Sequence, residues 1–148
     1  MKYYVVDAFT ENVFEGNTAA ICIMEEWFSE EMMQKIAIEN KLPETAYVVK
    51  EGEGYKLRLF TPEGEIDLCG HATVAAAYVI ANYYEKEAEE FKFLTKSGEL
   101  IVTKKNDVYE MDFPSRIPEK ITLTEEMVKA IGIKPVVSYL GRNLIFVI

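Results

Sequence analysis

Histidine and cysteine are nearly absent from this chain of 148 residues, which contains one histidine and two cysteines. Cys22 and Cys69 are widely separated, and their spacing fits neither a disulfide framework nor a zinc site. A single histidine without a cysteine cluster leaves few groups that could hold a transition metal. We therefore expect a protein without a bound metal and without disulfides.

The signatures of nucleotide chemistry are missing as well. The sequence has no phosphate-binding P-loop, no GxGxxG fingerprint and no nucleophilic serine elbow, so ATP and dinucleotide chemistry are not indicated. The net charge is −9, and the 16 Lys and Arg residues are scattered, whereas binding to a phosphate backbone requires clustered cations. We expect neither a cofactor nor a nucleic-acid partner.

Long apolar segments are also lacking. No run approaches the roughly 20 apolar residues of a membrane-spanning helix. Residues 1–10 have neither the basic start nor the long apolar stretch of a signal peptide. The expectation is a cytoplasmic protein that has no membrane partner.

Apolar residues nevertheless make up 49% of the chain, which is enough to build a substantial core in one compact domain. Strand and helix patterns alternate without an obvious linker. The expected helices cover 29–42, 69–84 and 124–131. The expected strands cover 2–9, 19–24, 45–50, 55–61, 91–95, 99–104, 108–113, 136–140 and 144–148.

This order predicts an α+β fold with a mostly antiparallel sheet. The segment from Ala72 to Ala81 has no charge and no proline, so it is typical of a helix that is buried on nearly every side. One flat sheet covers only one side of a helix. We therefore expect the sheet to roll around this central helix.

The start of the buried helix is the most informative stretch of the chain. It carries a thiol, a glycine and the only histidine, as Cys69-Gly70-His71, in place of a polar cap. The first N–H groups of a helix have no partner within it and carry partial positive charge. An open start of this kind is a candidate cradle for a carboxylate or phosphate. The alternative is a core helix with a satisfied histidine at its end.

Three further side chains have both a functional and a structural interpretation. Glu44, flanked by apolar residues at the mouth of a strand, would be partly desolvated, as suits a general acid/base, or would be a solvated loop residue. Cys69 could have its thiolate stabilised by the helix dipole, or could be a small buried residue. Asn17 could offer its amide to a ligand, or could simply form a turn with Gly16.

Five sequence blocks together resemble one family, the PhzF-like isomerases named after phenazine biosynthesis. The blocks occur in the order and approximate spacing of that family, and they are DAFT at 7–10, FEGNTAA at 14–20, ETAYV at 44–48, LFTP at 59–62 and LCGHAT at 68–73. The resemblance covers essentially all 148 residues, but only the N-terminal half of a usual family member.

The resemblance implies a lobe like those of diaminopimelate epimerase, in which a rolled antiparallel sheet surrounds a central helix. It also implies proton transfer on a small carboxylic acid without a cofactor. The family's acid/base then falls on Glu44, and its substrate-binding groups fall on Asn17, Gly70 and His71. Because PhzF-like proteins use the glutamate, Cys69 is interpreted as a structural residue or a bystander, although related epimerases have a catalytic cysteine at this position.

Two departures from the family pattern matter. Pro43 stands where many members have a serine before the glutamate. The second lobe, with its own acidic residue and anion-binding helix start, is absent, so residues 1–148 are expected to form a single N-terminal lobe. A two-fold homodimer would supply a second copy of the lobe.

The terminal run 144–148 leaves three possibilities open: pairing within the domain, pairing with a second copy, or continuation into further sequence. The alternative to an isomerase is a non-catalytic half-length or truncated member that binds a small anion. A purely structural interaction module would rest on the apolar terminus alone.

Overall fold

The computed structural model describes residues 1–113, 117–141 and 144–147, the last four by their backbone only. The chain forms two compact units, Met1–Asp112 and Phe113–Ile148. Unit 1 contains both the open helix start and the predicted acid/base. Among the described residues, no helix is long and apolar enough to cross a membrane.

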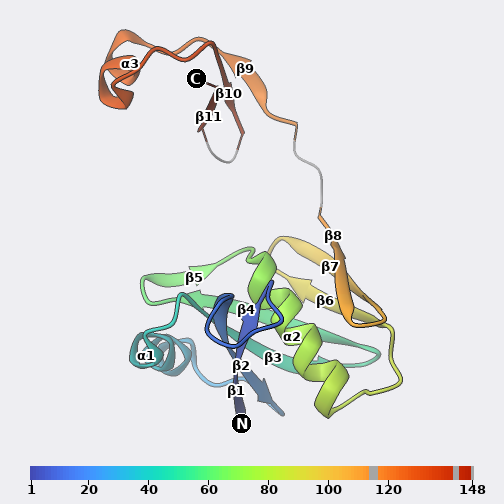
Figure 1. Ribbon diagram of the computed structural model, residues 1–148. Coiled ribbons are helices and arrows are strands. Elements are labelled where there is room, and N and C mark those ends of the chain that lie inside the picture. Colours follow the sequence, from blue (N-terminus) through green and yellow to red (C-terminus); the bar gives the residue numbers. More distant parts are fainter. Residues whose placement is uncertain (114–116, 142–143, 148) are drawn as a thin grey trace. The chain divides into compact units, whose positions relative to one another are not determined.

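Unit 1 is built around one eight-stranded sheet with the order β1-β2-β3-β4-β6-β7-β8, to which β5 is added through β4 (Figure 1). The β2–β3 and β4–β6 pairs are parallel, and the other pairs are antiparallel. The strands are β1 Lys2–Ala8, β2 Asn17–Met24, β3 Glu44–Glu51, β4 Gly54–Thr61, β5 Gly64–Ile66, β6 Glu90–Thr95, β7 Gly98–Lys105 and β8 Val108–Asp112. This arrangement confirms the predicted rolled, mostly antiparallel α+β fold.

The helix α2, Gly70–Tyr83, lies on the concave side of the sheet and is the centre of the core (Figure 1). It is in contact with β1, β2, β3, β7 and β8, so strands from both edges of the sheet reach it. Its small side chains allow this close approach, since Ala72, Ala76 and Ala77 are completely buried. The absence of charge in the sequence therefore reflects burial on several sides.

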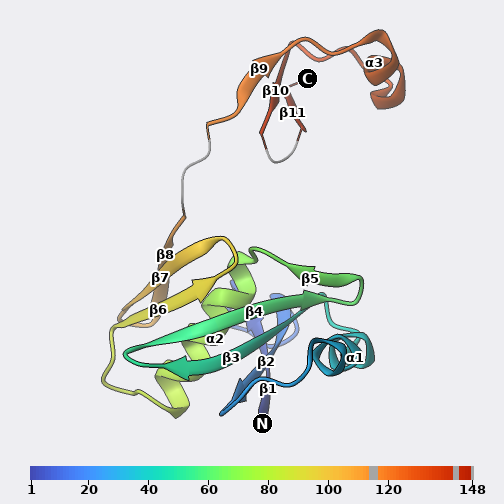
Figure 2. The same ribbon diagram turned by 180° about the vertical axis from the view of Figure 1, so that it is seen from behind.

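The helix α1, Glu30–Asn40, covers the opposite face of the sheet, as Figure 2 shows from behind. Period-2 alternation along β3 explains how one strand serves both helices. Ala46 and Val48 belong to the core cluster around α2, whereas Tyr47 and Val49 pack in the cluster around α1. The Tyr47 hydroxyl donates a hydrogen bond of 2.6 Å to the Met33 carbonyl of α1.

The described residues of unit 2 form one short helix and a small antiparallel sheet with the order β11-β10-β9. Its elements are β9 Glu119–Ile121, α3 Glu125–Ile131, β10 Val137–Leu140 and β11 Leu144–Val147. Of the three possibilities for the terminal run, pairing within the chain is observed for its backbone, because β11 pairs with β10. Ile148 and the side chains of 144–147 lie outside the described residues.

Most element boundaries agree with the sequence prediction to within two residues, with three differences. The short strands β5 and β9 were missed, because three residues are too few to establish a period of two. Asn17 was placed in a turn, but it is the first residue of β2 and pairs with Ala8. Glu44 likewise begins β3, so it is a strand residue and not a solvated loop residue.

Replacing Gly16 by alanine should destabilise unit 1. A Cβ atom at Gly16 would lie 2.4 Å from the Ala8 carbonyl oxygen and 2.6 Å from a methyl of Thr10, so the backbone must shift. We expect a loss of about 1–3 kcal/mol in the free energy of unfolding. Urea unfolding followed by the fluorescence of the single tryptophan, which lies in unit 1, measures it. Glu11→Ala, at an exposed position of the same loop, should change stability by less than about 0.5 kcal/mol.

Candidate active site

Successive side chains of β3 alternate between the two faces of the sheet, and this alternation places Glu44 on the face that carries α2. Glu44 precedes Ala46 and Val48 by two and four residues, and both of these side chains pack in the α2 cluster. Its neighbour across the parallel β2–β3 pair is Ala19, which belongs to the same cluster. The Glu44 side chain is only 18% exposed, so its carboxylate is mostly removed from water.

The start of α2 differs from the starts of the other two helices. Ser29 and Thr124 cap α1 and α3 by accepting hydrogen bonds from backbone amides, and each is followed by two acidic residues. The N-cap residue of α2 is Cys69, whose side chain makes no capping hydrogen bond, and its first turn contains no acid. The first bond within the helix runs from the Thr73 amide to the Cys69 carbonyl. The amides of Gly70 and His71 therefore have no helical acceptor.

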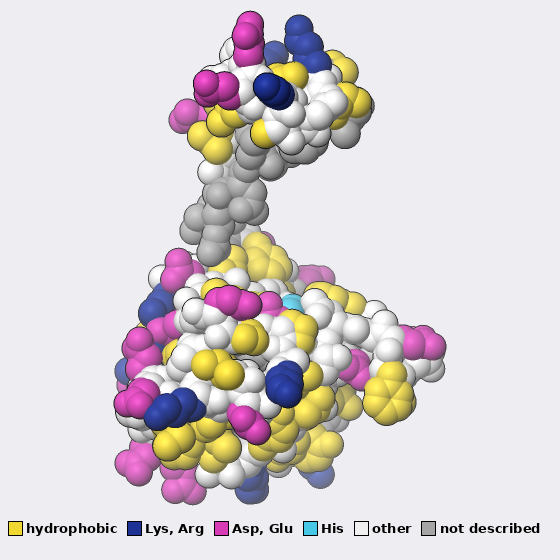
Figure 3. All heavy atoms as spheres, turned by 90° about the vertical axis from the view of Figure 1, so that its left-hand side faces the viewer, with side chains coloured by type: hydrophobic (Ala, Val, Ile, Leu, Met, Phe, Trp, Pro, Cys, Tyr) yellow, Lys and Arg dark blue, Asp and Glu magenta, His cyan; other side chains and the backbone are white. Residues whose placement is uncertain are grey.

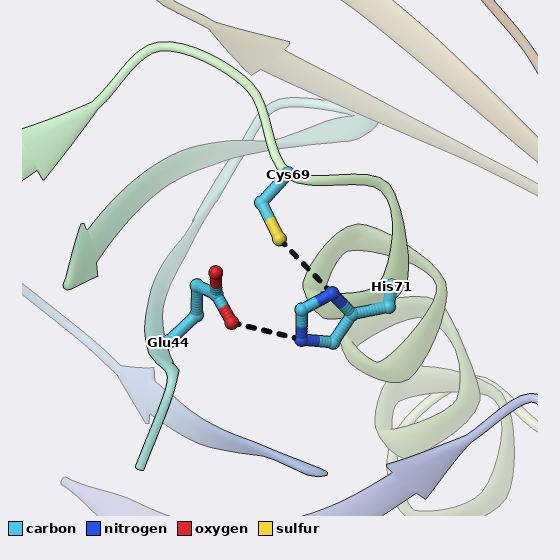
Figure 4. A group of neighbouring side chains, drawn as sticks. All are labelled: Glu44, Cys69 and His71. Carbon is cyan, nitrogen blue, oxygen red and sulfur yellow. Dashed lines mark hydrogen bonds and ion pairs between the residues drawn. The ribbon is translucent and has the colours of Figure 1, made fainter. Parts of the chain in front are cut away.

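Glu44, Cys69 and His71 meet at this open helix start (Figure 4). Each ring nitrogen of His71 lies close to a different side chain. Its Nε2 lies 3.0 Å from Glu44 Oε2, and its Nδ1 lies 3.3 Å from Cys69 Sγ. The predicted proximity of Glu44 to His71 is thus observed, whereas their roles in catalysis stay predictions.

The contact between Glu44 and His71 is close without being a good hydrogen bond. Although Nε2 and Oε2 are 3.0 Å apart, neither atom has a partner with acceptable hydrogen-bond geometry, and both atoms are buried. We regard the pair as an attractive but misaligned contact, because the distance is short and only the direction is unfavourable. Buried polar atoms left in this condition are costly, and they are typical of sites that are completed by a ligand.

The Cys69 thiol is not activated by its position at the helix start. Burial, the largest effect, raises the pKa of the Cys69 thiol to about 11. The Ala72 amide, the next largest effect, lowers the pKa. The Glu44 carboxylate then raises it, and the His71 amide lowers it slightly. The hypothesis of a dipole-stabilised thiolate is therefore wrong, because desolvation outweighs the helix amides and the thiol keeps its proton at neutral pH.

The same three side chains are the one group, within the described part of the chain, that has the composition and closeness of a metal site, with donor atoms within 4.8 Å of one another. Their geometry fits a hydrogen-bonded chain better than a chelate. The in-plane bonding directions of the two ring nitrogens diverge, and each nitrogen is close to a different partner. Figure 4 shows the Cys69 sulfur joined to Nδ1 and the Glu44 carboxylate joined to Nε2, so the two side chains do not meet at the same ring nitrogen.

The other two predicted site residues are placed less tightly. Gly70 is the first residue of α2 and is half-buried. Asn17 is exposed and lies two residues before Ala19, the strand partner of Glu44, so alternation directs its side chain to the α2 side of the sheet. The His71 ring is 9% exposed, and Figure 3 shows the histidine colour only as a small patch among apolar and acidic side chains.

The sequence did not predict a set of hydrogen bonds next to Asn17. Asp7, the strand partner of Thr18, accepts hydrogen bonds from the Thr18 hydroxyl and from the Phe14 amide. These two bonds, that of Thr18 being the stronger influence, hold the pKa of the Asp7 carboxyl below its ordinary value. A hint was available, because the DAFT block ends where the loop before Asn17 begins, but nothing in the spacing revealed the pairing.

Comparison with known proteins identifies one family. Residues 6–134 match the family model described as phenazine biosynthesis-like protein, PhzC-PhzF. An uncharacterized isomerase of Pseudomonas aeruginosa is 41% identical over 92% of this chain and 52% of its own length. Another from Halalkalibacterium halodurans is 43% identical over 95% of this chain and 53% of its own length.

A solved structure agrees with these relatives. The crystal structure of a PhzF family protein from Enterococcus faecalis is 55% identical and superposes with a TM-score of 0.85, covering 97% of this chain and 55% of that one. The chain thus spans about half the length of the relatives it matches.

Proposed function

The chain belongs to the PhzC-PhzF family of phenazine biosynthesis-like proteins, and from this premise we propose that it takes part in cofactor-independent isomerisation or epimerisation. Glu44 acts as the acid/base that moves a proton on a small carboxylic acid. The amides of Gly70 and His71 hold the carboxylate or a developing oxyanion, and the Asn17 amide contributes a further contact.

One observation carries this proposal. A mostly buried carboxylate and an imidazole lie 3.0 Å apart at an uncapped helix start, and the facing atoms lack hydrogen-bond partners. A substrate carboxylate bound at the helix start would bring negative charge to amides that have no acceptor within the helix. It would also bring a carbon acid next to Glu44, where proton transfer needs direct contact.

Charge does not decide against an acidic substrate. The net charge of −9 repels anions at long range, but at about 0.15 M salt this field is screened beyond roughly 8 Å. Inside the site, amides fixed at a helix start act without reorganising and stabilise charge as it develops. Local donors therefore outweigh the overall field.

Exchange of carbon-bound protons tests the proposal. The chain is incubated in deuterated buffer with a panel of small carboxylic acids that have an acidic C–H, and deuterium uptake is followed by NMR. Uptake above the uncatalysed rate is the expected result. The outcome that contradicts catalysis by this chain is the absence of uptake for every acid, both for the chain alone and in the presence of a separately produced second lobe from a relative.

A second candidate function is the binding of a small anion without catalysis, by a half-length or truncated family member that keeps the fold. The observation that favours it is the uncapped start of α2, whose Gly70 and His71 amides can bind an anion whether or not a proton is moved. The two functions differ in one measurement: binding of a small carboxylate, detected by shifts of the Gly70 and His71 amide resonances, without any deuterium uptake would support this alternative.

We expect the chain to self-associate as a two-fold dimer, which would bring a second lobe to the site. Large apolar side chains are exposed together in the loop before β2, where Phe9, Val13 and Phe14 are 75%, 74% and 94% exposed. Extended apolar patches are rare on stable monomers. Sedimentation equilibrium at micromolar concentration should give about twice the chain mass of 16.9 kDa, and a clean monomer would contradict the dimer.

A further inference from the structure

Cys69 is the member of the cluster that the proposed reaction leaves without a role. We propose that the Cys69 thiol donates a hydrogen bond to Nδ1 of His71 and thereby holds the ring in the tautomer whose Nε2–H faces Glu44. Cys69 is then a positioning residue, and its importance for catalysis rests on the proposed function. The contact itself, 3.3 Å from sulfur to nitrogen, lies within the range of a sulfur hydrogen bond.

The orientation follows from what lies on the other side of the ring. An ionised Glu44 carboxylate can only accept, and its Oε2 is 3.0 Å from Nε2. If Nε2 carried no proton, its lone pair would lie 3.0 Å from a negatively charged oxygen, and the contact would be repulsive even though the two atoms are not aligned for a good hydrogen bond. The proton of a neutral ring therefore belongs on Nε2, which leaves Nδ1 as an acceptor that needs a donor.

The thiol is the donor that occupies this place. Because burial raises the pKa of the Cys69 thiol to about 11, the sulfur keeps its hydrogen at neutral pH. A backbone carbonyl or carboxylate beside Nδ1, which is a common partner of histidine, would hold the opposite tautomer. A small donor at this position thus determines which nitrogen of His71 presents its proton to the acid/base.

The position of Cys69 also separates this role from a purely structural one. As the N-cap residue, Cys69 contributes its backbone carbonyl to the Thr73 amide and hydroxyl, and substitution of its side chain leaves both bonds in place. Its side chain makes no capping bond. Replacement of the side chain by alanine removes the contact with the ring and the packing of one sulfur atom in the α2 cluster, and it leaves the backbone bonds of the helix start in place.

Nitrogen NMR of the histidine ring tests the inference directly, because the chain has a single histidine and the spectrum contains one pair of ring nitrogens. In the unaltered chain, labelled with ¹⁵N-histidine, Nε2 should be protonated and Nδ1 unprotonated. In Cys69→Ala the two resonances should move toward each other as the second tautomer becomes populated. In Cys69→Ser, where a hydroxyl can donate, they should return toward their original positions.

Cys22→Ala is the matched control. Cys22 is the other buried cysteine, but it packs in the cluster around α1, so its removal should leave the ring resonances unchanged. A protonated Nδ1 in the unaltered chain would overturn the inference, and so would identical spectra before and after Cys69→Ala. The first measurement needs no variant, so the inference stays testable even if a variant does not fold. None of these spectra depends on turnover, so failure of the proposed reaction is a separate result.

Discussion

Glu44→Gln should reduce deuterium uptake into the best acid of the panel by about 10²- to 10⁴-fold, which is the usual contribution of a positioned acid/base. The amide has nearly the shape of the carboxylate and still faces His71, but it cannot accept and return a proton. Because it removes only the proton-carrying function, binding of the acid should persist. Uptake by NMR and binding by amide shifts, measured on the same samples, separate the two effects.

Glu39→Gln provides the control for Glu44→Gln. Glu39 is exposed on α1, and its replacement makes the same change of charge on the other side of the sheet from α2. Uptake should stay within twofold of the unaltered rate. If Glu44→Gln exchanges protons as fast as the unaltered chain, Glu44 is not the acid/base, and another residue must carry that role.

The central part of the fold was predictable because its signals are long. A helix without charge over ten residues requires covering on several sides, and alternating strands on both sides of it can provide this only by rolling around it. The features that escaped prediction are short or non-local. The three-residue strand β5 has no period to detect, and the pairing of Asp7 with Thr18 depends on a register that only the folded sheet defines.

The candidate site was predictable in its members more than in its chemistry. Resemblance to the family predicted that Glu44 shares a site with Gly70 and His71, although Glu44 is at least 26 positions away from both in the sequence. The helix dipole argument failed for Cys69, because two opposing effects act on the thiol and only the structure reveals how deeply it is buried. The use of the two ring nitrogens by different partners has no signature in the sequence.

A network of charged side chains around β5 leads to the second large effect. Glu65 on β5 accepts bonds of 2.7 and 2.6 Å from Nε and Nη2 of Arg58, and a bond of 2.6 Å from Lys96. Arg58 also reaches Glu30 of α1 at 2.9 Å and lies against the Trp27 ring. The Glu65 side chain is only 6% exposed, so its charge is mostly removed from water. This carboxylate therefore ties β4, β5 and the β6–β7 turn together.

Glu65→Gln should lower the free energy of unfolding of unit 1 by about 2–3 kcal/mol at neutral pH. This is less than the roughly 3–5 kcal/mol of a fully buried pair, because Arg58 remains 26% exposed. The tryptophan lies beside Arg58, so its fluorescence in a urea titration follows this region. Glu110→Gln, which breaks an ion pair whose side chains are 55% and 65% exposed, should cost less than about 1 kcal/mol.

The loss at Glu65 should also depend on pH with a definite sign. Arg58 above all, and then Lys96, hold the pKa of the Glu65 carboxyl below its ordinary value of 4.5. A lowered pKa in the folded state stabilises the protein above the ordinary value, and this stabilisation is lost as the pH falls through the lowered pKa. The unaltered chain and Glu65→Gln should therefore differ most at neutral pH and converge in acid. A constant difference at all pH values would show that packing, and not charge, is what Glu65 contributes.

Because β5 leads directly into the start of α2, the same substitution should disturb the His71 ring resonances, whereas Glu110→Gln should leave them unchanged.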